Sequence, residues 1–181
     1  MFQEILSRLA ATLDKHELPY MIIGGQAVLL YGEPRFTRDI DVTLGVGPDK
    51  LEEILSIIDL ARLRPIPKEI KTFVRETLVL PALDETTGIR VDFIFSLTPY
   101  ESQAIARGNK ISILETDVRF ASPEDIVIHK IFAGRPRDLE DVRGIILKNP
   151  DLDKVYIEKW LREFDAVSES KDFLKTFQSI H

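Results

Sequence analysis

The sequence predicts an α/β fold, in which a short mixed sheet is flanked by helices and followed by a helical C-terminal extension. Three observations support this fold class. Short apolar or alternating runs, such as 20–23, 39–44 and 89–96, are typical of strands. Segments with apolar residues three and four positions apart lie between them. From residue 122 the pattern is helical, so we expect a core over 1–120 and a helical extension over 121–181 packed on it.

In the core, prolines and glycines mark the ends of the predicted elements. Pro19 ends the first helix, Gly24-Gly25 turns the chain after the first strand, and Pro48 precedes another helix. We predict helices over 2–16, 26–32, 49–60 and 99–107, strands over 20–23, 39–44, 73–81, 89–96 and 110–114, and a surface loop over 61–71.

The extension has a clear start. Ser122 is placed as an N-cap, Pro123 as the first helical residue, and two acids occupy the first turn. Breaks are expected at 134–136, at 149–150 and near 167–168.

Composition excludes several classes of site. The chain of 181 residues has a formal net charge of −6, which argues against non-specific coating of nucleic acid. It has no cysteine, which excludes disulfides, thiolate zinc sites and cysteine nucleophiles. No apolar run approaches the roughly 18 residues of a membrane span, and we expect a cytoplasmic protein.

Two of the predicted strands carry carboxylates. The alternation puts Asp39 and Asp41 on one face of the strand 39–44, and it puts Asp92 beside Arg90 on the face opposite Phe93. Like charges about 4 Å apart repel by roughly 1 kcal/mol in water and about 4 kcal/mol at an intermediate dielectric. A cation between them relieves this repulsion, and Mg²⁺ prefers carboxylate oxygens. If the strands are neighbours, three carboxylates can hold two metal ions of the kind used in phosphoryl displacement.

A glycine pair precedes these acids. Gly24 and Gly25 lie between a strand and a helix, where backbone N–H groups and the helix dipole favour an anion such as phosphate. Taken singly, a Gly-Gly pair is more often a plain turn, and an Asp-x-Asp strand is more often a solvated edge. The order of the features is more specific than either one.

The combination resembles the polymerase-β-like nucleotidyltransferase superfamily, and within it the small AbiEii-type branch. The matching residues are Ile23-Gly24-Gly25, a spacer of thirteen residues, Asp39-Ile40-Asp41-Val42, and Asp92 in RVDFIF. The segment SPEDIVIHKIFAGRPRDLEDVRGIIL is similar to the region that follows the catalytic core in that family.

The resemblance implies a role for each matching residue. Asp39, Asp41 and Asp92 would bind Mg²⁺ or Mn²⁺, and Asp92 would also help to deprotonate an attacking hydroxyl. Gly24 and Gly25 would hold the phosphates of a nucleoside triphosphate. Lys130 would contact the triphosphate, and Asp138 would be the acid of the adjoining helix motif. From the residues alone, a lysine on a helix is usually solvated, and Asp138 and Asp141 are equally consistent with simple pairing to Lys130, Arg135 or Arg137.

The sequence therefore predicts an enzyme that moves a nucleoside monophosphate from an NTP to a hydroxyl. The resemblance implies a tRNA 3′ end or a side chain of a partner protein as acceptor, and a role in a toxin–antitoxin or defence system. A catalytically silent nucleotide-binding or antitoxin-like module of the same fold is the alternative. A domain whose acids are merely solvated is a third interpretation; it predicts no metal-dependent nucleotide binding.

Overall fold

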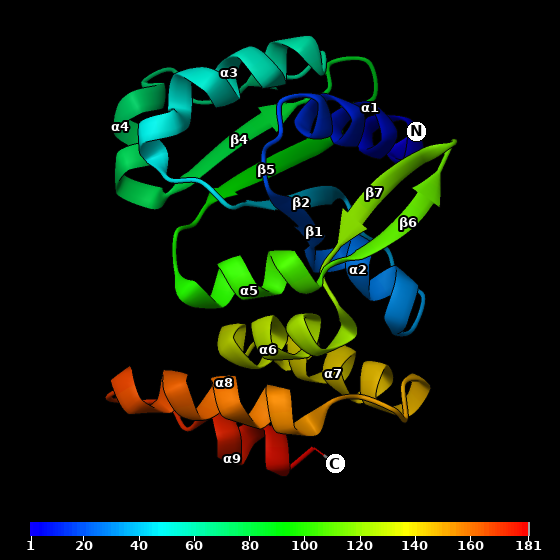
Figure 1. Cartoon of the computed structure of the whole chain (residues 1–181), viewed down its shortest axis with the longest axis vertical. Coiled ribbons are helices and arrows are strands. Elements are labelled where there is room, and N and C mark those ends of the chain that lie inside the picture. Colours follow the sequence, from blue (N-terminus) through cyan, green and yellow to red (C-terminus); the bar gives the residue numbers. More distant parts are fainter. Residues whose placement is uncertain (181) are drawn as a thin grey trace. The chain divides into compact units, whose positions relative to one another are not determined.

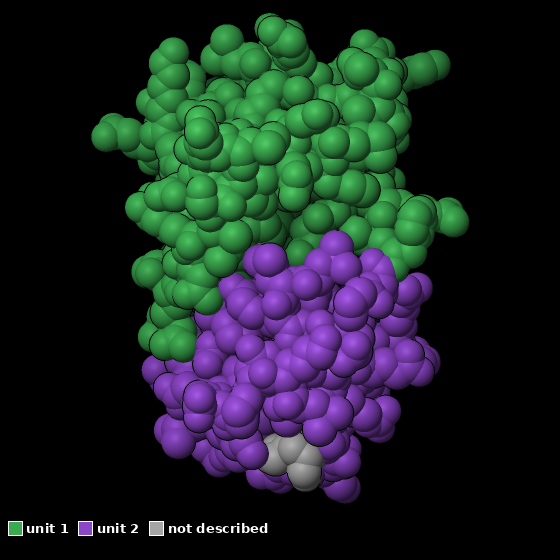
Figure 2. All heavy atoms as spheres, turned by 90° about the vertical axis from the view of Figure 1, so that its right-hand side faces the viewer, with its two compact units in different colours: residues 1–26, 36–121 green, residues 27–35, 122–181 purple. Residues whose placement is uncertain are grey.

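A computed structural model describes residues 1–180 (Figure 1). Within it the chain forms two compact units. The first unit comprises residues 1–26 and 36–121, and the second comprises residues 27–35 and the chain from Ser122 (Figure 2). No helix within residues 1–180 has the length and apolarity needed to cross a membrane.

The first unit is built on a mixed sheet with the strand order β3-β4-β5-β2-β1-β7-β6. The strands are β1 (Tyr20–Ile23), β2 (Asp39–Leu44), β3 (Arg64–Pro65), β4 (Val79–Leu83), β5 (Arg90–Phe95), β6 (Asn109–Ile113) and β7 (Thr116–Phe120). β2 runs parallel to β5 and β1 runs parallel to β7, whereas the other neighbours are antiparallel. The predicted α/β fold and its mixed sheet are thus confirmed.

The helices of the first unit cover this sheet. They are α1 (Phe2–Lys15), the start of α2 (Gly24–Tyr31), η1 (Pro48–Lys50), α3 (Leu51–Leu60), α4 (Ile70–Thr77) and α5 (Pro99–Arg107). α1 packs against β7 and β6, and α4 packs against β4. Alternate residues of β5, including Phe93, are buried, which confirms the predicted apolar face of that strand.

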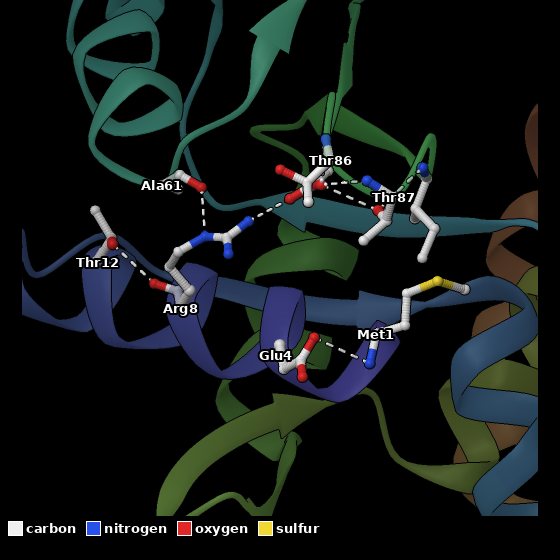
Figure 3. Close-up of polar contacts among 9 residues, drawn as sticks. Met1, Glu4, Arg8, Thr12, Ala61, Thr86 and Thr87 are labelled. Carbon is white, nitrogen blue, oxygen red and sulfur yellow. Dashed lines mark hydrogen bonds and ion pairs between the residues drawn. The ribbon is translucent and has the colours of Figure 1, made fainter.

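An ion pair anchors α1 to the loop between β4 and β5 (Figure 3). Arg8 Nη2 lies 2.5 Å from Asp84 Oδ2, and Arg8 Nε donates to the carbonyl oxygen of Ala61 at 2.6 Å. Asp84 is buried and also accepts hydrogen bonds from the backbone N–H groups of Thr86 and Thr87. These contacts hold the loop that leads into β5, the strand that carries Asp92, against α1.

Two predictions for the first unit were wrong. Residues 73–81 form the end of α4 and then β4, because Ile70, Phe73, Val74 and Thr77 follow a helical i, i+3, i+4, i+7 pattern. The helix stops at Leu78, which adopts the left-handed φ of 57°. The predicted loop 61–71 accordingly contains β3 and the start of α4.

The strand β7 was not predicted. It forms a hairpin with β6 through Leu114 and Glu115, whose φ values are 47° and 63°. A two-residue turn of this kind usually contains Asn or Gly, so the sequence carries no turn signal here.

The second unit consists of helices and the loops between them. Its helices are the remainder of α2, α6 (Pro123–Ala133), α7 (Pro136–Lys148), α8 (Lys154–Val167) and α9 (Phe173–Gln178). Ser122 caps α6 by accepting from the Asp125 N–H, as predicted. Hydrogen bonds from Lys148 and Asn149 to the carbonyl oxygens of Gly32 and Tyr31 tie the end of α7 to the segment 27–35.

Candidate active site

The pairing of β2 with β5 brings two of the predicted carboxylates side by side. The two strands are parallel and in a register that sets Asp41 opposite Asp92 and Asp39 opposite Arg90. Residues opposite one another in neighbouring strands share a face, and the strands are about 4.8 Å apart. Three carboxylates and one guanidinium therefore occupy adjacent positions on one half-buried face of the sheet.

Gly24 lies directly against the Asp41 carboxylate. β1 and β2 are antiparallel with Ile23 opposite Asp41, so the residue after Ile23 meets that side chain. A Cβ on Gly24 would lie 1.9 Å from Asp41 Oδ2, and Gly24 has a φ of +63°. Both observations require glycine at this position.

The helix α2 begins on these glycines rather than after them. Its bounds are Gly24–Tyr31, whereas the sequence predicted a helix over 26–32. The first N–H groups of a helix have no partner within that helix, and they carry the positive end of its dipole. The structure thus places the N-terminus of α2 beside Asp41, and it brings Gly24, Asp39, Asp41 and Asp92 together within the first unit.

Two residues of this region were not identified from the sequence. Gln26 in the first turn of α2 is buried, and its Nε2 has no hydrogen-bond partner among residues 1–180. The other is Arg90, whose Nε lies 2.7 Å from Asp92 Oδ1. The missing partner of Gln26 is visible only in the structure, whereas the sequence already placed Arg90 on the same face as Asp92 without showing that the two are paired.

The Arg90 guanidinium interacts electrostatically with all three acids. The hydrogen bond to Asp92 raises the pKa of the Arg90 guanidinium, desolvation opposes this, and the charges of Asp92, Asp39 and Asp41 raise the pKa further. The Arg90 side chain is half exposed and that of Asp92 is mostly buried, with 51% and 16% of their side-chain surfaces accessible.

The three acids fit a divalent cation in ligand type and register. Carboxylate oxygens are the ligands that Mg²⁺ and Mn²⁺ prefer, and the sheet aligns Asp41 with Asp92. As the side chains stand, no three His, Asp or Glu residues within 1–180 are close enough together to hold a metal ion. Assembly of a metal site from these carboxylates therefore requires side-chain movement, and Asp92 is held by Arg90.

The other two predicted site residues lie in the second unit, in a buried ion-pair cluster. Lys130 Nζ is 2.7 Å from Asp138 Oδ1 and 3.0 Å from Asp141 Oδ2. Arg135 Nε lies 2.5 Å from Asp138 Oδ2, and Arg35 Nε lies 3.2 Å from Asp141 Oδ1. Lys130, Asp138 and Asp141 are all buried, so the pairing that the sequence left open is present.

This cluster determines the ionisation of Asp138. Burial alone would raise the pKa of that carboxyl, but hydrogen bonds from Arg135 and Lys130 outweigh it and hold the pKa below its ordinary value. The charged form of Asp138 is therefore the one that the folded protein stabilises.

A glycine turn into a helix, a parallel strand pair carrying acids and the strand order of the sheet define a nucleotidyltransferase fold. Residues 1–172 match the family model described as nucleotidyltransferase of unknown function (DUF6036), and the chain belongs to this family. It is thus a nucleotidyltransferase by family, as the resemblance to the polymerase-β-like superfamily implied. No curated protein matches the chain by sequence.

Solved structures of nucleotidyltransferases share this fold. The antibiotic-resistance factor ANT(2″)-Ia in solution has a TM-score of 0.60 at 18% identity, over 91% of each chain. A crystal structure of ANT(2″)-Ia with adenylyl-2″-tobramycin gives 0.58 at 19% identity, over 88% of this chain and 94% of that one. An antigenic nucleotidyltransferase-like protein from Paracoccidioides brasiliensis gives 0.59 at 18% identity, over 97% and 91%. At these identities the likeness establishes the fold.

Gly24→Ala should destabilise the protein more than Gly88→Ala. Both glycines have positive φ, +63° and +73°, but an added Cβ at Gly88 meets no atom within 4 Å. Backbone strain of about 1 kcal/mol is therefore common to both variants, and the excess at Gly24 measures the clash with Asp41. Urea unfolding of both variants measures the difference.

The double variant Gly24→Ala/Asp41→Ala supplies the control, because removal of the carboxylate should recover most of the excess. Equal losses of stability in the two single variants would contradict the contact between Gly24 and Asp41.

Asp138→Asn should lower the free energy of unfolding at pH 7 by about 3 kcal/mol, the scale of a broken buried ion pair. Because the folded-state pKa of Asp138 is lowered, its contribution is present above the unfolded value of about 3.9 and is lost as pH falls through the folded value. The variant should therefore show a shallower loss of stability between about pH 5 and pH 2.

Chemical denaturation across this pH range tests the expectation, with the exposed Asp151→Asn as the matched control. If Asp138→Asn unfolds with the wild-type pH dependence, the cluster does not govern the acid stability of the second unit.

Proposed function

We propose that this protein transfers a nucleoside monophosphate from an NTP to a hydroxyl and releases pyrophosphate. The observation that carries the proposal is the register of β2 and β5, which sets Asp41 opposite Asp92 while Gly24 lies against Asp41. An anion-binding helix end and a group of carboxylates thereby meet on one face. Binding of phosphate and binding of a divalent cation are the two requirements of phosphoryl transfer.

The phosphates of the NTP would bind at the start of α2. The backbone N–H groups of its first turn donate to phosphate oxygens, and glycine at residues 24 and 25 lets the phosphates approach the backbone. The unpartnered Nε2 of Gln26 supplies a further donor in the same turn.

The transfer step follows from the placement of the acids. The acceptor oxygen forms a bond to the α-phosphorus, and the bond from that phosphorus to the bridging oxygen of the β-phosphate breaks. Pyrophosphate carries away the electron pair, and Asp92 accepts the proton of the acceptor hydroxyl. Asp39, Asp41 and Asp92 would hold Mg²⁺ or Mn²⁺, which supplies charge neutralisation to the phosphates and to the attacking oxygen.

The nucleotide role of Lys130 and Asp138 stays a prediction. The five side chains of their cluster comprise three cations, Arg35, Lys130 and Arg135, and two carboxylates, Asp138 and Asp141. One positive charge is therefore in excess among these five, which is the sign that favours a triphosphate. Arg135 exposes 74% of its side chain and is the accessible member of the cluster.

Three classes of acceptor are open to test. The resemblance suggests a tRNA 3′ end or a hydroxyl side chain of a partner protein. By the same analogy, the protein would act in the cytoplasm as part of a toxin–antitoxin or defence system. The complex of ANT(2″)-Ia with adenylyl-2″-tobramycin adds a small-molecule alcohol. Fold-level likeness does not choose among them.

The ion pair between Arg90 and Asp92 favours a second candidate function. A carboxylate held by a guanidinium is less available to a metal ion or a proton, as in a silent nucleotide-binding or antitoxin-like module. That module would bind NTP in the presence of Mg²⁺ without turning it over.

Label transfer separates these functions. The protein is incubated with each α-³²P-labelled NTP, Mg²⁺ or Mn²⁺, and either total RNA, cell protein or tobramycin, with Asp41→Asn beside it. We expect label on one acceptor class, and a loss of more than about 100-fold in Asp41→Asn, the scale of one preorganised electrostatic contact.

Asn has the shape of Asp, so the variant should keep the space beside Gly24 and unfold at the wild-type temperature. A destabilised Asp41→Asn would assign the residue a structural role instead. NTP binding by calorimetry with no label on any acceptor would favour the silent module.

A further inference from the structure

Arg90 is shared between the carboxylates and a cavity. In the sheet, Arg90 is opposite Asp39 on the neighbouring strand. On its own strand it forms an ion pair with Asp92, two residues further along. It also lines a cavity of about 500 Å³ that is bordered by residues of α4 and by Pro81 of β4. The cavity is also lined by Ile66, Pro67, Lys68, Glu69, Thr72, Phe73, Glu76 and Pro81.

The metal-free carboxylates need a positive charge. Three acids at adjacent positions repel one another, and the repulsion grows as the surroundings become less polar than bulk water. Arg90 provides the charge from within the same two strands, through its hydrogen bond to Asp92 Oδ1 at 2.7 Å. This inference rests on the proposed function, because it takes the same three acids as the metal site.

The same hydrogen bond opposes assembly of that site. Asp92 is directed to Arg90, and no three acidic or histidine side chains in the described part of the chain are grouped for a metal ion. A divalent cation at Asp92 and a guanidinium on the same carboxylate repel each other. Binding of the cation is therefore favoured when Arg90 releases Asp92.

The cavity offers the released side chain a destination. Glu69 and Glu76 line it together with Arg90, so two further carboxylates are available there to a guanidinium. The Arg90 side chain exposes 51% of its surface, and its long, flexible stem can turn without a change in the backbone.

We propose that Arg90 is the resident counter-cation of the three carboxylates, which a divalent metal ion displaces from Asp92 toward this cavity. Arg90 is thus a positioning residue that offsets part of the negative charge of the acids before metal binds. Metal loading therefore moves the guanidinium from Asp92 into the cavity.

Mn²⁺ binding without nucleotide tests the proposal, with free Mn²⁺ followed by electron paramagnetic resonance. Arg90→Gln should bind Mn²⁺ roughly fivefold more tightly than wild type, the scale of releasing one partly exposed ion pair. The gain should vanish in an Asp92→Asn background, because the competition acts through that carboxylate.

Arg64→Gln is the matched control. Arg64 and Arg90 are both opposite Leu83, on the two strands that flank β4, so Arg64 lies two strands from Arg90 in the same row of the sheet. Like Arg90, it forms an ion pair, in this case with Glu85. Its loss removes the same charge at about 10 Å, where salt screens most of the effect. We expect the wild-type Mn²⁺ affinity in this variant.

Equal affinities in wild type and Arg90→Gln would overturn the proposal. Equal gains in Arg90→Gln and Arg64→Gln would do the same, as would a gain that persists in Asp92→Asn. If Asp41→Asn abolishes Mn²⁺ binding while Arg90→Gln changes nothing, the metal site stands and only the role of Arg90 fails. If neither wild type nor Arg90→Gln binds Mn²⁺, the metal site fails as well.

Discussion

The parallel register of β2 and β5 is the constraint on which the candidate site depends. A slip by one residue would turn Asp92 to the opposite face and bring Phe93 opposite Asp41. The buried face of β5 prevents that slip, because Phe93 and Phe95 are buried there. Hydrophobic burial on one face thereby holds three charged groups together on the other, against their mutual repulsion.

Opposite charges are paired in both units, with different consequences. In the second unit, Lys130 is buried between two carboxylates, each of which also meets an arginine. In the first unit, the Arg90–Asp92 pair is partly exposed and borders a cavity. A buried pair is costly to break and an exposed one is cheap. The Lys130 cluster of the second unit is therefore suited to a structural role, and the Arg90–Asp92 pair of the first unit is suited to a change of state.

The sequence predicted the strands that carry the acids because their alternation is strong. β1 and β2 have the predicted bounds, and the face of β5 that carries Asp92 was assigned correctly. α4 was mistaken for a strand because Phe73 and Val74 favour strands locally, although their spacing with Ile70 and Thr77 is helical. The contact of Gly24 with Asp41 and the placement of Asp41 opposite Asp92 depend on strand register, which one strand's pattern does not contain.

The proposed function requires that these three carboxylates form a metal-dependent nucleotide site. A crystal of the protein grown with Mn²⁺ and a non-hydrolysable ATP analogue tests this requirement most directly, since anomalous scattering locates the ions. We expect Mn²⁺ bound by Asp39, Asp41 and Asp92, with the analogue's phosphates at the N-terminus of α2. Nucleotide or Mn²⁺ bound elsewhere, with Asp92 still on Arg90, would contradict it.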